Sequence, residues 1–231
     1  MIPYENQLIG AFLYAAGYAG GLSARSDNPS APMPVNLLQQ TLLDRSFSDL
    51  VVGHQRCFVL EFKRSLKELA EEKAKWNSGQ LAQFGGDKIL KSQSKRGHLV
   101  IYGRPGPGTI VLRVCFYLDI LGLTTEPHLD RMSAQRLIEK LHGLASAEKV
   151  DYGLPPAQLL AYLEVMRTLR RKQGSAGGRS PKESAWIGVA VDEDGFSYRS
   201  ADSLDELFGL DLALEQEQEP DHEPSSPGME R

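Results

Sequence analysis

The stretch Asp49-Leu-Val-Val-Gly-His-Gln-Arg-Cys-Phe-Val-Leu-Glu-Phe-Lys63 places charged residues within two short apolar segments. Strands this rich in Val, Leu and Phe normally exclude such charges. If the segments form a hairpin around residues 54–56, Asp49 can lie opposite Glu61, with the two Cβ atoms about 4.5–5.5 Å apart. Lys63, two residues after Glu61, points to the same face. The stretch therefore predicts two carboxylates and an ammonium group side by side.

This arrangement depends on the register of the hairpin. It requires Gly53 opposite Cys57 and Val51 opposite Val59. A slip of one residue would move Asp49 to the other face of the pair.

Two carboxylates that close repel each other unless a proton or a divalent cation lies between them. A lysine beside them can stabilise a developing oxyanion or position a nucleophilic water. The pattern is typical of a metal-dependent centre that cleaves phosphodiesters.

At these residues the chain resembles the PD-(D/E)XK nuclease superfamily, which includes restriction endonucleases, RecB-type nucleases and archaeal Holliday-junction resolvases. Asp49 matches the first acidic residue of the family, and Glu61-Phe62-Lys63 matches its E-x-K motif; Ser48 stands where the family name has proline. The resemblance implies that Asp49 and Glu61 hold Mg²⁺ or Mn²⁺, together with the backbone carbonyl of Phe62. It also implies that Lys63 acts on the attacking water.

A helix is predicted from Tyr4 to Ala19, with Glu5 in its first turn and with an apolar stripe made of Leu8, Ile9, Phe12 and Leu13. RecB-like members of the family carry a glutamate on the first helix that reaches the metal site, so the resemblance implies that Glu5 is a further metal ligand. The alternative is that Glu5 only complements the helix dipole.

A second helix is predicted from Ser65 to Phe84. It carries Gln80-Leu-Ala-Gln-Phe84, which is similar to the Gln-x-x-x-Tyr motif of RecB-type nucleases, with phenylalanine in place of tyrosine. The resemblance implies a catalytic role for Gln80 in organising the site. An ordinary polar helix position is the alternative.

The order of predicted elements favours an α/β fold with a mixed sheet flanked by helices. The resemblance implies that residues 1–125 form a restriction-endonuclease-like αβββαβ core. Residues 35–44 allow either a helix or the first strand that this fold needs. Strands are predicted at His98–Arg104 and Thr109–Ile120, joined by a turn at residues 105–108.

A helical and small β-hairpin appendage is predicted after the core. A helical extension covers residues 126–172, with helices from Ser133 to about Ala147 and from Pro155 or Pro156 onward. Residues 173–184 are expected to be a flexible linker, 185–212 a β-hairpin and short helix, and 213–231 a disordered acidic tail.

Basic residues end the last helix of this extension. Arg167, Arg170 and Arg171 are candidates for contacts with nucleic-acid phosphates. The alternative is that they only complement the carboxyl end of the helix dipole.

The composition allows a nucleic-acid partner. The chain has 231 residues and a net charge of −4, but residues 201–231 hold ten acidic residues and one basic residue, which leaves 25 basic and 20 acidic residues in 1–200. A mildly basic body suits a binder of the phosphate backbone. The two cysteines lie in apolar runs and are expected to be free thiols. No segment has the length of a membrane span, so a cytoplasmic protein without a membrane partner is expected.

The sequence thus predicts a Mg²⁺- or Mn²⁺-dependent nuclease, with DNA as the favoured substrate, acting in a repair, restriction or phage-defence system. The main alternative is a catalytically inactive protein of the nuclease fold that serves as a binding or scaffold subunit. A protein partner or a homodimer is left open.

Overall fold

The computed structural model describes residues 4–23, 35–37, 50–53, 56–106, 108–141, 152–170, 186–192 and 195–201 of the chain. The elements in chain order are α1 (Glu5–Ser23), β1 (Val35–Leu37), β2 (Leu50–Gly53), β3 (Cys57–Lys63), η1 (Leu66–Glu68), α2 (Leu69–Ala74), α3 (Ser78–Gly86), α4 (Lys88–Gly97), β4 (His98–Gly106), β5 (Thr109–Phe116), α5 (Tyr117–Leu121), β6 (Met132–Ser133), α6 (Ala134–Leu141), α7 (Pro156–Arg170), β7 (Trp186–Asp192) and β8 (Gly195–Ala201).

Strands β1 to β6 form a mixed sheet in which their order follows the sequence. Strands β3 and β4 are parallel, whereas the other neighbours are antiparallel. The parallel pair is connected by the crossover through η1 and α2–α4, because two parallel strands cannot be joined by a tight turn. The expected α/β class with a mixed sheet is therefore confirmed.

The register predicted for the first hairpin is confirmed. Val51 pairs with Val59, and Gly53 pairs with Cys57, in the antiparallel β2–β3 ladder, which the structure describes as far as the pair Leu50–Leu60. Asp49 lies outside the described residues.

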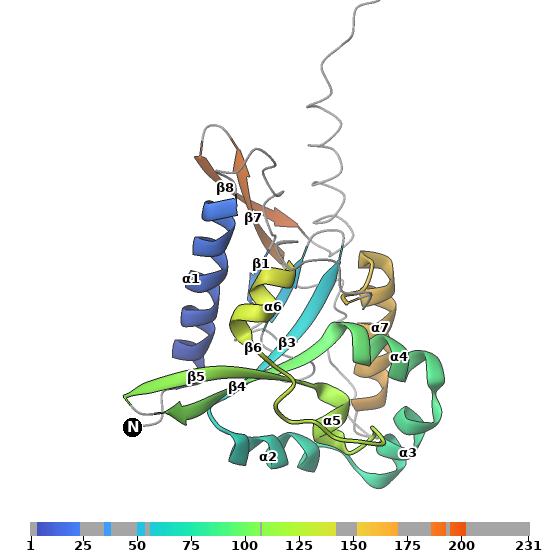
Figure 1. The fold of residues 1–231 in the computed structure, drawn as a ribbon. Helices are drawn as coiled ribbons and strands as arrows, with labels where there is room; N and C mark the ends of the chain where they lie inside the picture. Colours follow the sequence, from blue (N-terminus) through green and yellow to red (C-terminus); the bar gives the residue numbers. More distant parts are fainter. Residues whose placement is uncertain are drawn as a thin grey trace, which may run out of the picture.

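The two faces of the sheet bury separate apolar clusters. Cys57 and Val59 of β3 face a cluster with α2–α5 and α7. Phe58, Leu60 and Phe62 face a cluster with α1 and α6. In Figure 1, α1 and α7 lie on opposite sides of β3. All seven residues of β3 are buried, so its two charged residues lie inside the protein.

The first helix has the predicted apolar stripe. Leu8, Ile9, Phe12 and Ala16 of α1 are buried against the sheet. The helix runs to Ser23, four residues beyond its predicted end at Ala19. A glycine inside a helix costs only about 1 kcal/mol relative to alanine, which is little enough for the helix to continue.

The second predicted helix, Ser65–Phe84, is wrong in its continuity, because the structure has η1, α2 and α3 in its place. The helical segment ends before Asn77. The Asn77 side chain accepts a hydrogen bond from the Gln80 backbone, and the Gln80 side chain accepts one from the Asn77 backbone. This capping box starts α3 as a separate helix. Helix α4 was not predicted; its N-cap is Asp87, which accepts hydrogen bonds from the backbone of Ile89 and Leu90.

The strand predicted at Thr109–Ile120 ends earlier, at Phe116, and α5 begins at Tyr117. The Asp119 side chain accepts a hydrogen bond from the Phe116 backbone, and Gly122 ends the helix in a left-handed conformation with φ 71°. The Asp119 contact and the C-terminal glycine therefore favour a helix at residues 117–121, although the apolar residues there also suit a strand.

The helices and the hairpin predicted after the core are present where the structure describes this part of the chain. Ser133 accepts a hydrogen bond from the Arg136 backbone at the start of α6, α7 begins at Pro156, and β7 and β8 form an antiparallel pair. The linker at 173–184, the short helix near 203–208 and the acidic tail at 213–231 lie outside the described residues. In the part of the chain that is described, no helix has the length and apolar character needed to cross a membrane.

A close backbone contact holds β4 against the end of β3. A Cβ atom at Gly103 would lie 2.7 Å from the carbonyl oxygen of Arg64, whereas a Cβ atom at Gly10 on α1 has no described atom within 4 Å.

We expect Gly103→Ala to lower the free energy of unfolding by about 1–3 kcal/mol, because the backbone must shift to admit the methyl group. The control Gly10→Ala should raise it by about 0.5–1 kcal/mol, since alanine favours the helix. Urea unfolding monitored by circular dichroism measures both. Equal effects of the two substitutions would contradict the contact.

Candidate active site

Glu61 and Lys63 lie near the end of β3, on the face that also carries Val59. Glu61 is 4% exposed and Lys63 is 9% exposed. The Lys63 Nζ atom donates hydrogen bonds to the Glu61 carboxylate and, at 2.9 Å, to the carbonyl oxygen of Phe62. The Lys63 ammonium group therefore lies against the backbone of β3, its own strand.

Helix α1 adds a second carboxylate. Glu5, in the first turn of α1, accepts a hydrogen bond from Lys63 Nζ at 3.3 Å, and its side chain is 36% exposed. The structure thus brings together Glu5, Glu61 and Lys63, three residues expected at the site. The partial exposure of Glu5 places it on the solvent side of the cluster.

A third carboxylate, Glu72 of α2, was not expected from the sequence. Its Oε2 atom lies 3.7 Å from Lys63 Nζ and 2.5 Å from Lys75 Nζ, and its side chain is fully buried. A signal was present in the sequence: Glu72 has helical spacing with Leu69 and Trp76, which are both buried, so it occupies the apolar side of α2.

Arg170 balances this buried carboxylate. Its guanidinium group from α7 donates hydrogen bonds to Glu72 and, at 2.6 Å, to the Tyr117 hydroxyl, which in turn donates to Glu72 at 2.8 Å. Trp76 Nε1 donates to the same hydroxyl at 3.0 Å. Burial alone would raise the pKa of Glu72, but Arg170, Lys75 and Lys63 lower it to about 2. Glu72 is therefore ionised at neutral pH.

His98 extends this network at the start of β4. Its ring stacks on Tyr117, with 3.9 Å between ring centroids, and its Nδ1 atom lies 2.7 Å from the Tyr162 hydroxyl. Burial and the nearby charge of Arg170 lower the pKa of His98 to about 3. The imidazole is neutral and contributes no charge to the site at physiological pH.

Opposing effects act on the ammonium group of Lys63. Burial would lower its pKa, but Glu61, Glu5 and Glu72 raise the pKa of Lys63 above its ordinary value of 10.5. Lys63 is therefore protonated at neutral pH and serves as a donor rather than as a base.

The remaining expected site residues lie elsewhere or have other contacts. Gln80 caps α3, and its Nε2 atom donates to the carbonyl oxygen of Leu169 at 2.5 Å, so its side chain joins α3 to the end of α7. Arg170 points into the protein and not toward a surface phosphate, with its side chain 10% exposed. Arg167 pairs with Glu164 on the same helix, at 3.0 Å. Arg171 lies outside the described residues.

The groups around Lys63 Nζ are also suitable ligands for a hard divalent cation. They are the carboxylate oxygens of Glu61 and Glu5 and the carbonyl oxygen of Phe62. Mg²⁺ prefers oxygen donors of this kind. No group of three His, Cys, Asp or Glu side chains within the described ranges could hold a metal by itself, and Asp49, the other expected ligand, lies outside those ranges.

Comparison of the chain with protein-family models, curated proteins and solved structures finds no match. Its function is therefore inferred from the arrangement of its own residues.

The Glu72–Arg170 pair gives a prediction for stability. Glu72→Gln removes the carboxylate that accepts a hydrogen bond from the buried Arg170, so we expect the free energy of unfolding to fall by about 3–5 kcal/mol at neutral pH in buffer with EDTA. The control Glu164→Gln removes an exposed partner of Arg167 and should cost less than about 1 kcal/mol.

The pH dependence of this loss follows from the lowered pKa of Glu72. In the unfolded chain Glu72 takes up a proton below its ordinary pKa of 4.5, whereas in the folded protein it takes up this proton only near pH 2. The contribution of Glu72 is thus complete above pH 4.5 and disappears as the pH falls toward 2. Urea unfolding from pH 7 to 3 should show the difference between parent and Glu72→Gln shrinking below pH 4.5. A difference that stays constant over this range would refute the charge balance.

Proposed function

We propose that this protein is a metal-dependent nuclease that hydrolyses phosphodiester bonds in nucleic acid, with DNA as the favoured substrate. The observation that carries the proposal is the set of oxygen atoms around Lys63: the carboxylates of Glu61 and Glu5 and the Phe62 carbonyl. A buried lysine among carboxylates, at the end of a strand, fits the E-x-K centre expected from the sequence.

The order of elements supports the same proposal. Helix α1 precedes three antiparallel strands, and a helical crossover then leads to β4, which runs parallel to β3. This αβββαβ order agrees with the restriction-endonuclease-like core that the resemblance implies. Glu61 and Lys63 lie on the third of these strands, as the resemblance to PD-(D/E)XK nucleases implies.

The residues suited to hold Mg²⁺ or Mn²⁺ are Glu61, Glu5 and the Phe62 carbonyl, with Asp49 as the further ligand expected from the hairpin register. When bound, such a cation lowers the pKa of a coordinated water and neutralises charge on the phosphate. The Lys63 ammonium group already donates hydrogen bonds to these oxygens. A cation that binds there would replace some of these hydrogen bonds.

Lys63 supplies positive charge to the reaction. Because its raised pKa keeps it protonated, it can donate hydrogen bonds to the attacking water or to a phosphate oxygen on which charge develops. Glu72 forms ion pairs with Lys63 and Lys75, and it forms a further ion pair with Arg170. These contacts hold the ammonium group near the end of β3.

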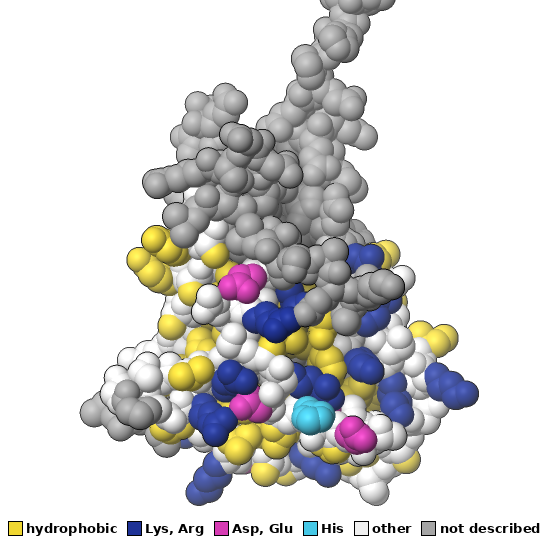
Figure 2. Space-filling model, viewed as in Figure 1, with side chains coloured by type: hydrophobic (Ala, Val, Ile, Leu, Met, Phe, Trp, Pro, Cys, Tyr) yellow, Lys and Arg dark blue, Asp and Glu magenta, His cyan; other side chains and the backbone are white. Residues whose placement is uncertain are grey.

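The surface charge agrees with a polyanionic substrate. Figure 2 shows Lys and Arg side chains spread over the lower part of the face in view, with few Asp or Glu side chains among them. Such a surface attracts a phosphate backbone.

Cleavage assays test the proposal directly. Supercoiled plasmid and single-stranded DNA should be cut with Mg²⁺ or Mn²⁺ and not with EDTA. Glu61→Gln, Lys63→Met and Asp49→Asn should each lower the rate at least 100-fold, because each removes a group acting at the reacting phosphate.

Two exposed residues near the site serve as matched controls. Glu71→Gln and Lys67→Met make the same chemical changes on the surface and should leave the rate within about twofold. If Glu61→Gln cuts as fast as the parent protein, the site assignment is wrong. Binding of DNA without cleavage in any of these metals would favour the alternative, an inactive binding subunit.

A further inference from the structure

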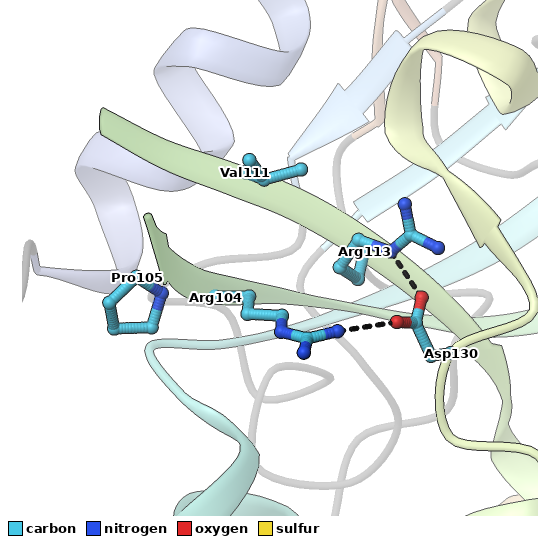
Figure 3. Close-up of a pocket in the computed structure, with 5 residues that line it drawn as sticks. All are labelled: Arg104, Pro105, Val111, Arg113 and Asp130. Atoms are coloured by element: carbon cyan, nitrogen blue, oxygen red, sulfur yellow. Dashed lines mark hydrogen bonds and ion pairs between the residues drawn. The ribbon is translucent and has the colours of Figure 1, made fainter. Parts of the chain in front are cut away.

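A second cluster of charged residues lies at the outer end of the β4–β5 hairpin. A pocket of about 340 Å³ is lined there by Arg104, Pro105, Val111, Arg113 and Asp130. In Figure 3 the two arginine side chains converge on Asp130 from neighbouring strands. The pocket therefore combines two guanidinium groups with one carboxylate.

Asp130 bridges the two arginines and leaves part of each available. Arg104 Nη1 donates to Asp130 Oδ2 at 2.8 Å, and Arg113 donates through Nε to Asp130 Oδ1. Among the described side chains, Asp130 is the ion-pair partner of both arginines. Within the described part of the chain, both terminal nitrogens of Arg113 and Nη2 of Arg104 make no hydrogen bond, so they can bind a ligand. A guanidinium edge of this kind matches the oxygens of a phosphate.

The loop that carries Asp130 is fixed on both sides. The buried Tyr102 donates a hydrogen bond from its hydroxyl to the carbonyl oxygen of Leu129 at 2.7 Å. On the other side the Arg131 backbone donates to Val114 at 3.0 Å, and the Arg131 guanidinium makes two hydrogen bonds to Asp119. Because these contacts hold residues 129 and 131, Asp130 is positioned to orient both arginines.

The pocket lies on the same face of the sheet as the candidate active site. Lys63 pairs with Tyr102, and Tyr102 pairs with Arg113, so these three residues form a row across β3, β4 and β5. Neighbouring strands are about 4.8 Å apart, which puts the backbone of Arg113 roughly 10 Å from that of Lys63. Arg104 lies two residues beyond Tyr102 on the same face. A short length of an extended nucleic-acid strand covers this distance.

We propose that Arg104 and Arg113, oriented by Asp130, bind a backbone phosphate of the nucleic acid next to the bond that is cut. This inference rests on the proposed nuclease function and adds a substrate-binding subsite to it. The two guanidinium groups hold one phosphate between them, and the carboxylate keeps the local charge low enough for the strand to be released. The ligand is a phosphate within a polynucleotide, not a free phosphate ion.

Binding in EDTA separates this subsite from catalysis. Fluorescence anisotropy with labelled single-stranded and duplex oligonucleotides, over a series of NaCl concentrations, gives the affinity and its salt dependence. Arg104→Ala and Arg113→Ala should each weaken binding three- to tenfold. Each should reduce the slope of log K against log salt by about 0.7–0.9, the value for one phosphate contact. The double variant should lose no more slope than either single variant, because the two arginines share one phosphate.

The control is Arg136→Ala, which removes an exposed arginine on α6, a helix that packs on the opposite face of the sheet. It should leave affinity and slope unchanged, and melting temperatures should show that all variants are folded. An equal loss in Arg136→Ala, or parent-like binding by the double variant, overturns the subsite. The subsite is also overturned if inorganic phosphate displaces the oligonucleotide when its concentration equals that of the oligonucleotide's phosphate groups, since this would indicate a site for the free ion.

The outcomes also distinguish the subsite from the proposed function. Glu61→Gln should bind oligonucleotides at least as tightly as the parent in EDTA, because it removes a negative charge, while losing cleavage in Mg²⁺. Cleavage by a parent protein whose binding is insensitive to Arg104 and Arg113 overturns the subsite alone. Arginine-dependent binding without any cleavage overturns the nuclease function and leaves the phosphate site. A parent protein that binds neither oligonucleotide overturns the subsite as well.

Discussion

Buried charge is the constraint on which the rest of this structure depends. Glu61 and Glu72 lie inside the protein, and a buried carboxylate is tolerated only if opposite charge and hydrogen bonds surround it. Lys63 and Arg170 supply that charge. Since these partners come from β3, α2 and α7, with Glu5 from α1, the packing of three helices against the sheet is tied to a single cluster of ions.

The parallel pairing of β3 with β4 connects this cluster to the rest of the sheet. It places Tyr102 beside Lys63 and carries the same face of the sheet on to Arg113. The apolar side chains of both faces fix the strands, so the charged residues at their ends have little freedom to move apart. A rigid row of this kind suits the binding of an extended polyanion, with Lys63 at one point and the arginine pair at another.

Much of this arrangement was predictable where the information is local. A hairpin centred on residues 54–56 predicted the register of β2 and β3, and the two-residue spacing predicted the common face of Glu61 and Lys63. The apolar stripe of α1 predicted the helix that brings Glu5 to Lys63. The part played by Arg170 could not be predicted, because its partner Glu72 is 98 residues away in the sequence and charges at a helix end are usually solvated. The helix cap formed by Gln80 and Asn77 was not predicted either, although these two residues are close in the sequence.

The central claim is that the oxygens now satisfied by Lys63 form a cation site, and Mn²⁺ binding tests it without any substrate. Electron paramagnetic resonance titration of free Mn²⁺ with the parent, Glu61→Gln and Lys63→Met measures the affinity of each. The parent should bind Mn²⁺, Glu61→Gln should bind at least tenfold more weakly, and Lys63→Met should bind more tightly because the competing ammonium group is gone. Equal Mn²⁺ affinity in the parent and Glu61→Gln would contradict the assignment of this cluster as a metal centre.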